Sequence, residues 1–256
     1  VMAAITSHNG LIERITTDYD SLEPIHGYYP VARSPLLSVG MAAHRGFHAQ
    51  AIPSSLPSGV TAYLPTQIHG GTNLLGFFLG VYHMINLGSI DISTNTFTAG
   101  SNMGTTTFGG QTVSRSGVLF AEVTTALNAT PGNLNVTYVD QSGNTAETNT
   151  AVALATAAPV GSGVFVRLNI GDGAVREVTG ANNSGGTSPT GVIKFWGLIP
   201  IGSTITNAYH GGFVIDGFNK RPLYRLPANA ILGGVVSGGT SAGGLEGSIR
   251  YVGDQA

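Results

Sequence analysis

Alternation of apolar and polar side chains, broken by glycine-rich turns, is the feature that most constrains this chain. Successive side chains of a strand point to opposite faces, so a period of two indicates a strand with one buried face. Three segments after Pro65 show this period, and no sustained helical period follows Pro65. Their alternating apolar residues are Leu119, Ala121, Val123 and Leu127; Leu134, Val136 and Tyr138; and Val164, Val166, Leu168 and Ile170.

Turn-forming residues separate these segments. Residues 140–144 read DQSGN and supply the glycine that a hairpin loop needs for a positive φ angle. Residues 99–104, 181–186 and 237–244 are rich in glycine and serine and are also expected to be loops. Short strands joined by such turns predict an all-β fold, either a β-sandwich or a jelly roll. A short helix near residues 9–15 is the one helical alternative.

Prolines distinguish the N-terminal part of the chain from the rest. They occur at residues 24, 30, 35, 53, 57 and 65, and because proline cannot donate a backbone hydrogen bond, this spacing disfavours a helix or a central strand. We therefore predict an extended N-terminal arm over residues 1–65 and a sandwich domain over residues 66–256. The arm is expected to lie along a neighbouring subunit, the alternative being that it folds back on its own domain. Its candidate partner-binding residues are Leu36, Leu37, Met41, Phe47 and Ile52.

The chain carries very little charge. Charged residues make up 9% of the 256 residues, whereas about 25% is usual in soluble proteins. Few like charges mean weak repulsion between copies, so the composition favours an assembly subunit and a homo-oligomer. The formal net charge of −2 leaves no basic stripe for phosphate groups, and we expect no binding to nucleic acid. The chain has no cysteine, so packing and subunit contacts must supply its stability.

The most apolar stretch, residues 73–87, is too short and too interrupted to span a bilayer as a helix. A spanning helix needs about 20 apolar residues, and this stretch contains Gly76, Gly80, His83 and Asn86. We interpret it as core strands and expect no membrane association. The N-terminal residues have no long apolar run and include acidic side chains, so we also expect no export signal.

One catalytic pattern is present, but its context argues against it. Residues 239–243 read GTSAG, which matches the G-x-S-x-G turn that exposes the serine nucleophile of α/β-hydrolases. A histidine follows the serine in that fold, and none follows Ser241 here. No other set of serine, histidine and acid has a familiar spacing. We predict a glycine-rich loop at residues 239–243 and no enzyme activity.

Candidate metal and cofactor motifs are incomplete as well. His44 and His48 have the i, i+4 spacing of zinc ligands on a helix, but Gly46 and the nearby prolines disfavour a helix. Residues 18–23 lack the glycine of a calcium loop, and residues 171–173 read GDG without the third glycine of a dinucleotide site. We predict turns at both places and no metal or cofactor.

Four stretches resemble a recurrent β-module of tailed-phage virion proteins. They read LFAEVTTALNATPGNLNVTYVDQSGNTAET at 119–148, GDGAVREVT at 171–179, NLGSIDISTNTFTAGSNMGT at 86–105 and IKFWGLIP at 193–200. The resemblance implies a non-enzymatic virion structural protein, such as a capsid decoration, cement or minor capsid protein. It implies the major capsid protein or another virion protein as the partner, and a place in the phage particle, which is assembled in the host cytoplasm. It marks no functional residues and does not reach the arm.

Two alternatives fit the same sequence. A tail, neck or fibre component would form closed rings or trimers on the tail instead of repeating over the head. A glycan-binding adhesion module would use loops at one end of the sandwich, with aromatic side chains as stacking platforms. The aromatic candidates for that role are Tyr63, Tyr82, Trp196 and Tyr209, which we interpret as core or interface residues.

Overall fold

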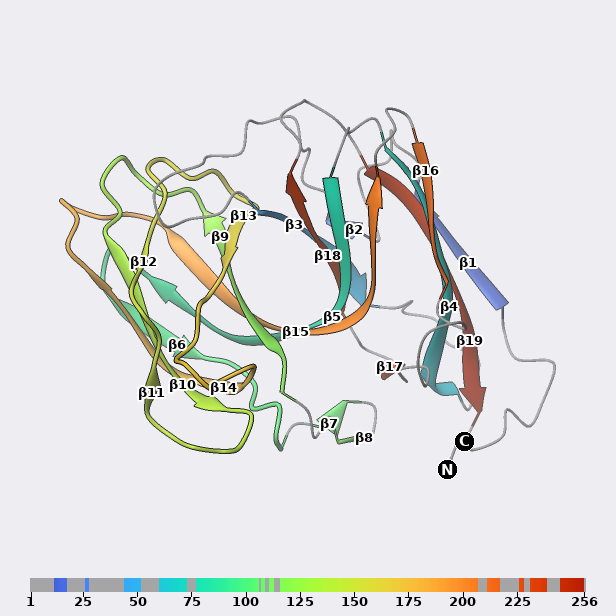
Figure 1. Ribbon diagram of the computed structural model, residues 1–256, viewed down its shortest axis with the longest axis horizontal. Coiled ribbons are helices and arrows are strands. Elements are labelled where there is room, and N and C mark those ends of the chain that lie inside the picture. The colour runs from blue at the N-terminus through green and yellow to red at the C-terminus, as the bar shows by residue number, and fades with distance from the viewer. Residues whose placement is uncertain are drawn as a thin grey trace.

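The computed structural model describes residues 12–17, 26–27, 44–51, 60–72, 77–105, 107–108, 111–112, 116–206, 211–216, 226–227, 231–238 and 245–255, with side chains in 82–105 and 116–200. These residues form 19 β-strands and contain no helix. The predicted all-β sandwich is therefore confirmed for this part of the chain. Figure 1 shows a small sheet, a curved central group of strands and a further sheet, which we call the outer sheet.

The small sheet is centred on β10 (Asn133–Asp140). One edge of β10 pairs with β14 (Val175–Ser184), and the other edge pairs with β11 (Glu147–Thr148) and β12 (Val152–Ala153). All of these pairs are antiparallel. The predicted hairpin turn at residues 140–144 is confirmed, because it connects β10 to β11 and contains Gly143 at a φ angle of 92°.

Six strands of the central group pair in a closed circuit, which we call the ring. Each strand pairs with the next, and the last, β3, pairs back to the first, β13. In Figure 1 β15 and β5 curve along one side of the ring, and β3 crosses the other side. In order, the strands are β13 (Ser162–Phe165), β9 (Val118–Thr125), β15 (Val192–Thr206), β5 (Phe77–Asp91), β18 (Ile231–Gly238) and β3 (His44–Ala51).

Short strands extend the ring at its edges. The outer sheet lies beside the ring (Figure 1). Within the outer sheet, β19 and β4 are the long paired strands, β1 pairs with β19, and both β16 and β17 pair with β4. The extending strands are β2 (His26–Gly27) on β3 and β6 (Thr96–Ala99) on β5. The strands of the outer sheet are β1 (Ile12–Thr17), β4 (Val60–Thr72), β16 (Gly211–Asp216), β17 (Leu226–Pro227) and β19 (Leu245–Gln255). A separate hairpin is formed by β7 (Thr107–Phe108) and β8 (Gln111–Thr112).

The main hydrophobic core, which we call the sandwich core, lies between the small sheet and one face of the ring. Side chains of β10, β12 and β14 meet side chains of β5, β9 and β15 there. The predicted period of two is confirmed in β10, whereas in β9 the residues between the predicted core positions are buried as well. Removal of apolar side chains from water is the main favourable term in folding. The buried alternating residues are Leu119, Ala121 and Val123 of β9 and Leu134, Val136 and Tyr138 of β10.

The third alternating segment differs from the prediction. Val164 and Val166 are buried as expected, but β13 ends at residue 165 and Ile170 is 103% exposed. The backbone leaves the sheet in a turn, in which the N–H of Asp172 donates to the carbonyl oxygen of Asn169 at 3.1 Å. Beyond the end of β13, Val166 and Leu168 still contact the sandwich core, and the predicted burial fails at Ile170.

Strands within the predicted arm pair with later strands of the same chain. β1 pairs with β19, while β3 pairs with both β18 and β13, so a segment of the first 65 residues belongs to the ring. The helical alternative near residues 9–15 is wrong from residue 12 onward, where the isoleucines and threonines of β1 favour a strand. Residue 65 lies inside β4, beside a register shift in the pairing with β19, a place where a strand tolerates proline.

The apolar stretch at residues 73–87 lies within β5 from residue 77 onward, in agreement with its interpretation as core strand. In the part of the chain that the structure describes, no helix is long and apolar enough to cross a membrane.

Candidate functional site

Phe47 is the one residue of the predicted partner-binding set that lies in a described strand. It belongs to β3, where its backbone is opposite Gly234 of β18. The motifs at residues 18–23 and 239–243 lie outside the described residues. The same holds for the other predicted partner-binding residues, Leu36, Leu37, Met41 and Ile52.

His44 and His48 lie on β3, in agreement with the prediction that they are not on a helix. A strand rises about 3.3 Å per residue, so the two Cα atoms are separated by roughly 13 Å, far more than in the zinc motif of a helix. Among the described residues, no three His, Cys, Asp or Glu side chains lie where they could hold a metal ion.

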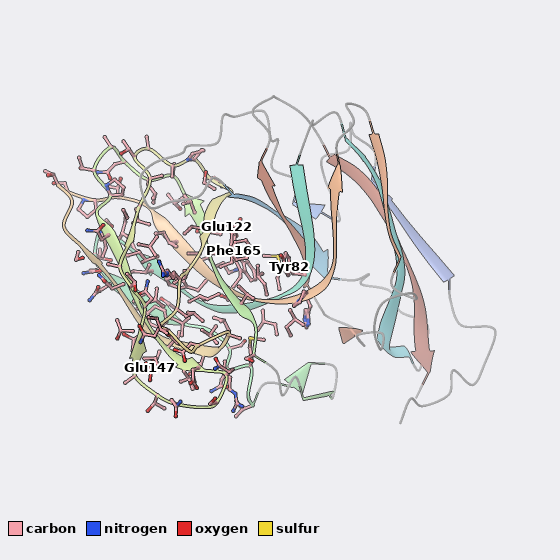
Figure 2. The ribbon with its side chains drawn as sticks, viewed as in Figure 1. Tyr82, Glu122, Glu147 and Phe165 are labelled. Carbon is pink, nitrogen blue, oxygen red and sulfur yellow. The ribbon has the colours of Figure 1, made fainter. Side chains whose placement is uncertain are left out.

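A second cluster of side chains, which we call the ring cluster, lies on the face of β5, β9 and β15 that is turned away from the sandwich core. Phe120 and Phe165 pack edge to face in it, with ring centroids 5.2 Å apart. Figure 2 shows Phe165 and Tyr82 within the curve of the ring. The apolar members of the cluster are Tyr82, Met84, Phe120, Phe165, Trp196 and Leu198.

Gly163 makes room for this cluster where β13 closes the ring. Its backbone lies between Glu122 of β9 and His44 of β3. A Cβ atom at Gly163 would meet the aromatic ring of Phe120 and would lie 2.6 Å from the carbonyl oxygen of Ala121. Close approach of the closing strand to β9 therefore requires glycine at this position.

Glu122 is an acidic residue inside the ring and is 1% exposed. Its Oε2 atom accepts a hydrogen bond from Nε1 of Trp196 at 2.7 Å. Lys194 is directly opposite Glu122 in the β9–β15 pair, so their side chains share a face. Nζ of Lys194 lies 4.2 Å from the centroid of the Trp196 ring, within the range of a cation–π contact. A carboxylate, an indole and an ammonium group thus lie together beside the apolar side chains of the ring cluster.

Burial dominates the electrostatics of the ring cluster. It lowers the pKa of Lys194, and the nearby Glu122 carboxylate opposes this shift by favouring the charged ammonium. It also raises the pKa of Tyr82, which packs against the same cluster.

Trp196 is 2% exposed, so its indole is not available to stack on a sugar. The interpretation of Trp196 as a core residue is confirmed, whereas Tyr209 and the side chain of Tyr63 lie outside the described residues.

A second polar network joins the end of β10 to the loop between β13 and β14, residues 166–174, which we call the Ile170 loop. The hydroxyl of Tyr138 donates to Oδ2 of Asp172 at 2.7 Å and accepts a hydrogen bond from the N–H of Asn169 at 2.9 Å. The side-chain amide of Asn169 donates to Oε2 of Glu147 at 3.0 Å. Figure 2 labels Glu147 on the small sheet, away from the ring cluster. The network therefore ties the Ile170 loop to both β10 and β11.

The turn that follows β10 is organised by Asp140 and also contacts the Ile170 loop. The Asp140 carboxylate accepts hydrogen bonds from the N–H groups of Ser142 and Asn144, both at 2.8 Å. Burial acts to raise the pKa of Asp140, but these hydrogen bonds outweigh it and the net shift is downward. Oε1 of Gln141, in the same turn, accepts from the N–H groups of Gly173 and Ala174, both at 3.2 Å.

Sequence reasoning identified two parts of this network but not their contact. Tyr138 was predicted as a buried strand residue, and residues 171–173 were predicted as a turn, which Gly171 at a φ angle of 102° confirms. Burial, followed by the hydrogen bond to Asp172, raises the pKa of Tyr138 to about 12, so the hydroxyl keeps its proton at neutral pH. A buried tyrosine needs a partner for its hydroxyl, and that requirement is the signal that could have revealed the contact.

Comparisons with family models, with curated proteins and with solved structures gave no match to this chain. What the chain does must therefore be inferred from its own residues and their geometry.

Proposed function

We propose that this chain is a non-enzymatic structural protein of a tailed-phage particle, and that it acts as a capsid decoration, cement or minor capsid protein. It would bind the major capsid protein or another virion protein and stabilise the particle by burying surface across subunit boundaries. A stable contact of this kind removes about 2,000 Å² or more of surface from water. The site of action would be the virion.

The observation that carries the proposal is that the phage-like stretches fold into one packed unit. All four stretches contribute to the sandwich core: Ile90 from residues 86–105, Leu134 from 119–148, Val178 from 171–179 and Phe195 from 193–200. Each of these side chains is at most 1% exposed. The four stretches thus meet in one packed unit, which also includes residues 152–166 between them, and this common core supports the proposal.

The use of buried polar side chains gives a second line of support. Oδ1 of Asn149 accepts a hydrogen bond from the N–H of Val136 at 2.6 Å, and its Nδ2 donates to the carbonyl oxygen of Thr150 at 2.8 Å. The buried Asp140 carboxylate holds its own turn in the same way. These side chains hydrogen-bond to backbone groups of their own turn and of the neighbouring strand, which is a structural role.

Binding of the purified full-length chain to phage particles that lack it tests the proposal. We expect saturable binding in co-sedimentation, an increase in the temperature at which the particles release their contents, and density for the chain on the head in images of the particle. Light scattering should show an oligomer. A strictly monomeric protein that ignores the particles, or one with hydrolase activity, would contradict the proposal.

The alternative functions give different outcomes in the same experiment. A tail, neck or fibre component would appear on the tail with closed rotational symmetry. A glycan-binding module would bind host polysaccharide in the absence of particles. The burial of Trp196 weighs against the second alternative as far as that platform is concerned.

A further inference from the structure

Asp172 and Gly173 form the one Asp–Gly pair that lies wholly within the described residues. Such a pair is chemically labile, because the main-chain nitrogen of glycine, which no side chain shields, can attack the carboxyl group of the aspartate before it. The other aspartates with described side chains, Asp91 and Asp140, precede isoleucine and glutamine. Both Gly171 and Gly173 are exposed, and a Cβ atom on either would have no atom within 4 Å. Neighbouring atoms therefore do not shield the pair.

Hydrogen bonds restrain this pair, and the first set comes from Gln141 in the β10–β11 turn. Its Nε2 donates to the carbonyl oxygen of Gly171 at 3.4 Å, and its Oε1 accepts from the N–H groups of Gly173 and Ala174, both at 3.2 Å. One side chain thus holds the peptide groups on both sides of Asp172. The N–H group of Gly173, which would have to react, is among them.

A different element holds the carboxyl group of Asp172. Its Oδ2 accepts from the hydroxyl of Tyr138 at 2.7 Å, and the same hydroxyl accepts from the N–H of Asn169 at 2.9 Å. The main-chain N–H of Asp172 donates to the carbonyl oxygen of Asn169 at 3.1 Å. Reaction requires the nitrogen of Gly173 and Cγ of Asp172 to come together in the correct orientation. Because each group is bonded to a separate partner, the loop must open locally before they can do so.

We propose that Asp172 is a latent site of isoaspartate formation, and that Gln141 and Tyr138 keep it in the unreacted state. The proposal goes beyond the proposed function and does not depend on it. It assigns to the hydrogen bonds of the Ile170 loop a protective role against covalent ageing of the chain.

The chemistry needs no reagent other than water. The nitrogen of Gly173 loses its proton and bonds to Cγ of Asp172 in its acid form, while the C–OH bond of the carboxyl group breaks and the hydroxyl leaves as water. The product is a five-membered cyclic imide. Addition of water at Cγ restores aspartate, whereas addition at the main-chain carbonyl carbon of Asp172 gives isoaspartate. The main chain then continues through Cγ and is one carbon longer, so the contacts with Tyr138 and Gln141 should not re-form.

The test follows isoaspartate in the purified full-length chain during prolonged incubation, in native buffer and in guanidinium chloride. Trypsin cleaves after Arg167 and Arg176, so the pair falls in the peptide of residues 168–176, which is unchanged in variants at residues 138 and 141. Isoaspartate has the same mass as aspartate, so chromatographic retention, fragmentation and methylation by isoaspartyl methyltransferase identify it. We expect the wild type to react about tenfold more slowly, or slower still, in native buffer, because several hydrogen bonds must break first.

Gln141→Ala is the decisive variant, because it removes the restraint from a turn outside the cores. It should accelerate the reaction in native buffer by about fivefold, the change in rate that corresponds to one neutral hydrogen bond. Tyr138→Phe should act in the same direction. Ser142→Ala is the matched control, because residue 142 uses only its main-chain N–H in the same turn, and it should react at the wild-type rate. Asp216 and Gly217 fall in the tryptic peptide of residues 195–220 and give an internal reference in each sample.

Gly173→Ala tests the chemical identity of the site. Gly173 does not have a left-handed φ angle and has open space around it, so alanine should fit and should suppress the reaction even in guanidinium chloride. A peptide of residues 168–176 that stays free of isoaspartate in denatured wild type would overturn the site. Equal rates in native and denatured wild type, or a wild-type rate in Gln141→Ala, would overturn the protection. Equal acceleration at Asp216 in Gln141→Ala would show a general loosening of the chain and would overturn it as well.

Discussion

The two faces of β9 are buried in different surroundings. On one face Leu119, Ala121 and Val123 enter the sandwich core, which β10 and β14 cover from the other side. On the other face Phe120 and Glu122 lie inside the ring, where the Glu122 carboxylate is engaged by an indole. The first core depends on apolar packing between two sheets. The second combines apolar packing with a polar contact, so its stability should respond to charge as well as to volume.

The largest expected effect is loss of packing in the sandwich core. Leu134 is fully buried between β10 and the ring, and Leu134→Ala should lower the free energy of unfolding by about 4 kcal/mol, through lost transfer free energy and the cavity that remains. Urea unfolding followed by circular dichroism measures the loss. Thr137→Ala, on the opposite face of the same strand, is the control and should cost less than about 1 kcal/mol. Equal losses in the two variants would contradict the described core.

The next effect separates the ring cluster from the sandwich core. Glu122→Leu keeps the side-chain volume nearly constant, but it leaves the Trp196 N–H and the half-buried Lys194 without the carboxylate, so we expect a loss of about 3 kcal/mol. Trp196 is the one tryptophan of the chain, so its fluorescence reports on the ring cluster during urea unfolding. Its native emission should change in Glu122→Leu and remain unchanged in Leu134→Ala.

Glu122→Gln serves as the matched control for that prediction. The glutamine keeps an oxygen that can accept from Nε1 of Trp196 but carries no charge opposite Lys194, so its loss should be smaller than that of Glu122→Leu. If Glu122→Leu proved as stable as the wild type, apolar packing alone would be sufficient to stabilise the inside of the ring. Some buried ion pairs in other proteins can likewise be replaced by apolar residues without loss of stability.

The difference between the cores also explains which parts of the fold the sequence could predict. The strand at Leu134 to Tyr138 was predictable, because an exposed face alternates there with a buried one. The ring was not, because β9 is buried on both faces and the partners that enclose its second face, β3 and β18, come from distant parts of the chain. Glu122 occupies an alternate position that resembles the solvent face of a half-buried strand, so the sequence contains no local signal of its burial.

The Ile170 loop illustrates the opposite error. Ile170 continues the apolar alternation of Val164 and Val166, and by that pattern it should be buried. Its exposure depends on the end of β13 and on the hydrogen bonds that the loop backbone donates to the side chains of Tyr138 and Gln141, which are about 30 residues away in sequence. Long-range contacts of this kind decide whether an apolar residue faces a core or the solvent, and a single sequence does not contain them.

An effect of intermediate size should appear when the pH is lowered. His83 is fully buried on β5 opposite Ile199 of the sandwich core, and burial lowers its pKa from 6.5 to about 4. Below pH 6.5 the unfolded chain therefore binds a proton that the folded chain does not accept. Stability contributed by the neutral imidazole should be lost as the pH falls from 6.5 toward 4, by about 2 kcal/mol at pH 5.

Urea unfolding at pH 7 and pH 5 measures this effect, with His83→Gln as the reference. The glutamine does not titrate, so the variant should lose about 2 kcal/mol less than the wild type over this interval, while the other histidines affect both proteins equally. Identical pH dependence in the two proteins would show that His83 accepts its proton in the folded state.

The smallest effect should have the opposite sign. Asn183 is directly opposite Leu134 in the β10–β14 pair, so its side chain is on the same face of the sheet, and it is 9% exposed. Neither Oδ1 nor Nδ2 has a hydrogen-bond partner among the described residues. Its main-chain N–H donates to Oδ1 of Asn95 at 2.7 Å, and this bond does not depend on the side chain.

Asn183→Leu replaces the amide by an apolar group of similar shape and should raise the free energy of unfolding by about 1 kcal/mol, because a buried polar group without partners destabilises the folded state. Asn182→Leu, at the exposed neighbouring position, is the control and should give no gain. A loss of stability in Asn183→Leu would mean that the amide is satisfied within the core and that the sandwich core requires a polar side chain, as the ring does. A gain in Asn183→Leu would confirm the contrast between the two cores. Replacing a buried polar side chain by leucine would then stabilise the sandwich core at Asn183 and destabilise the ring cluster at Glu122.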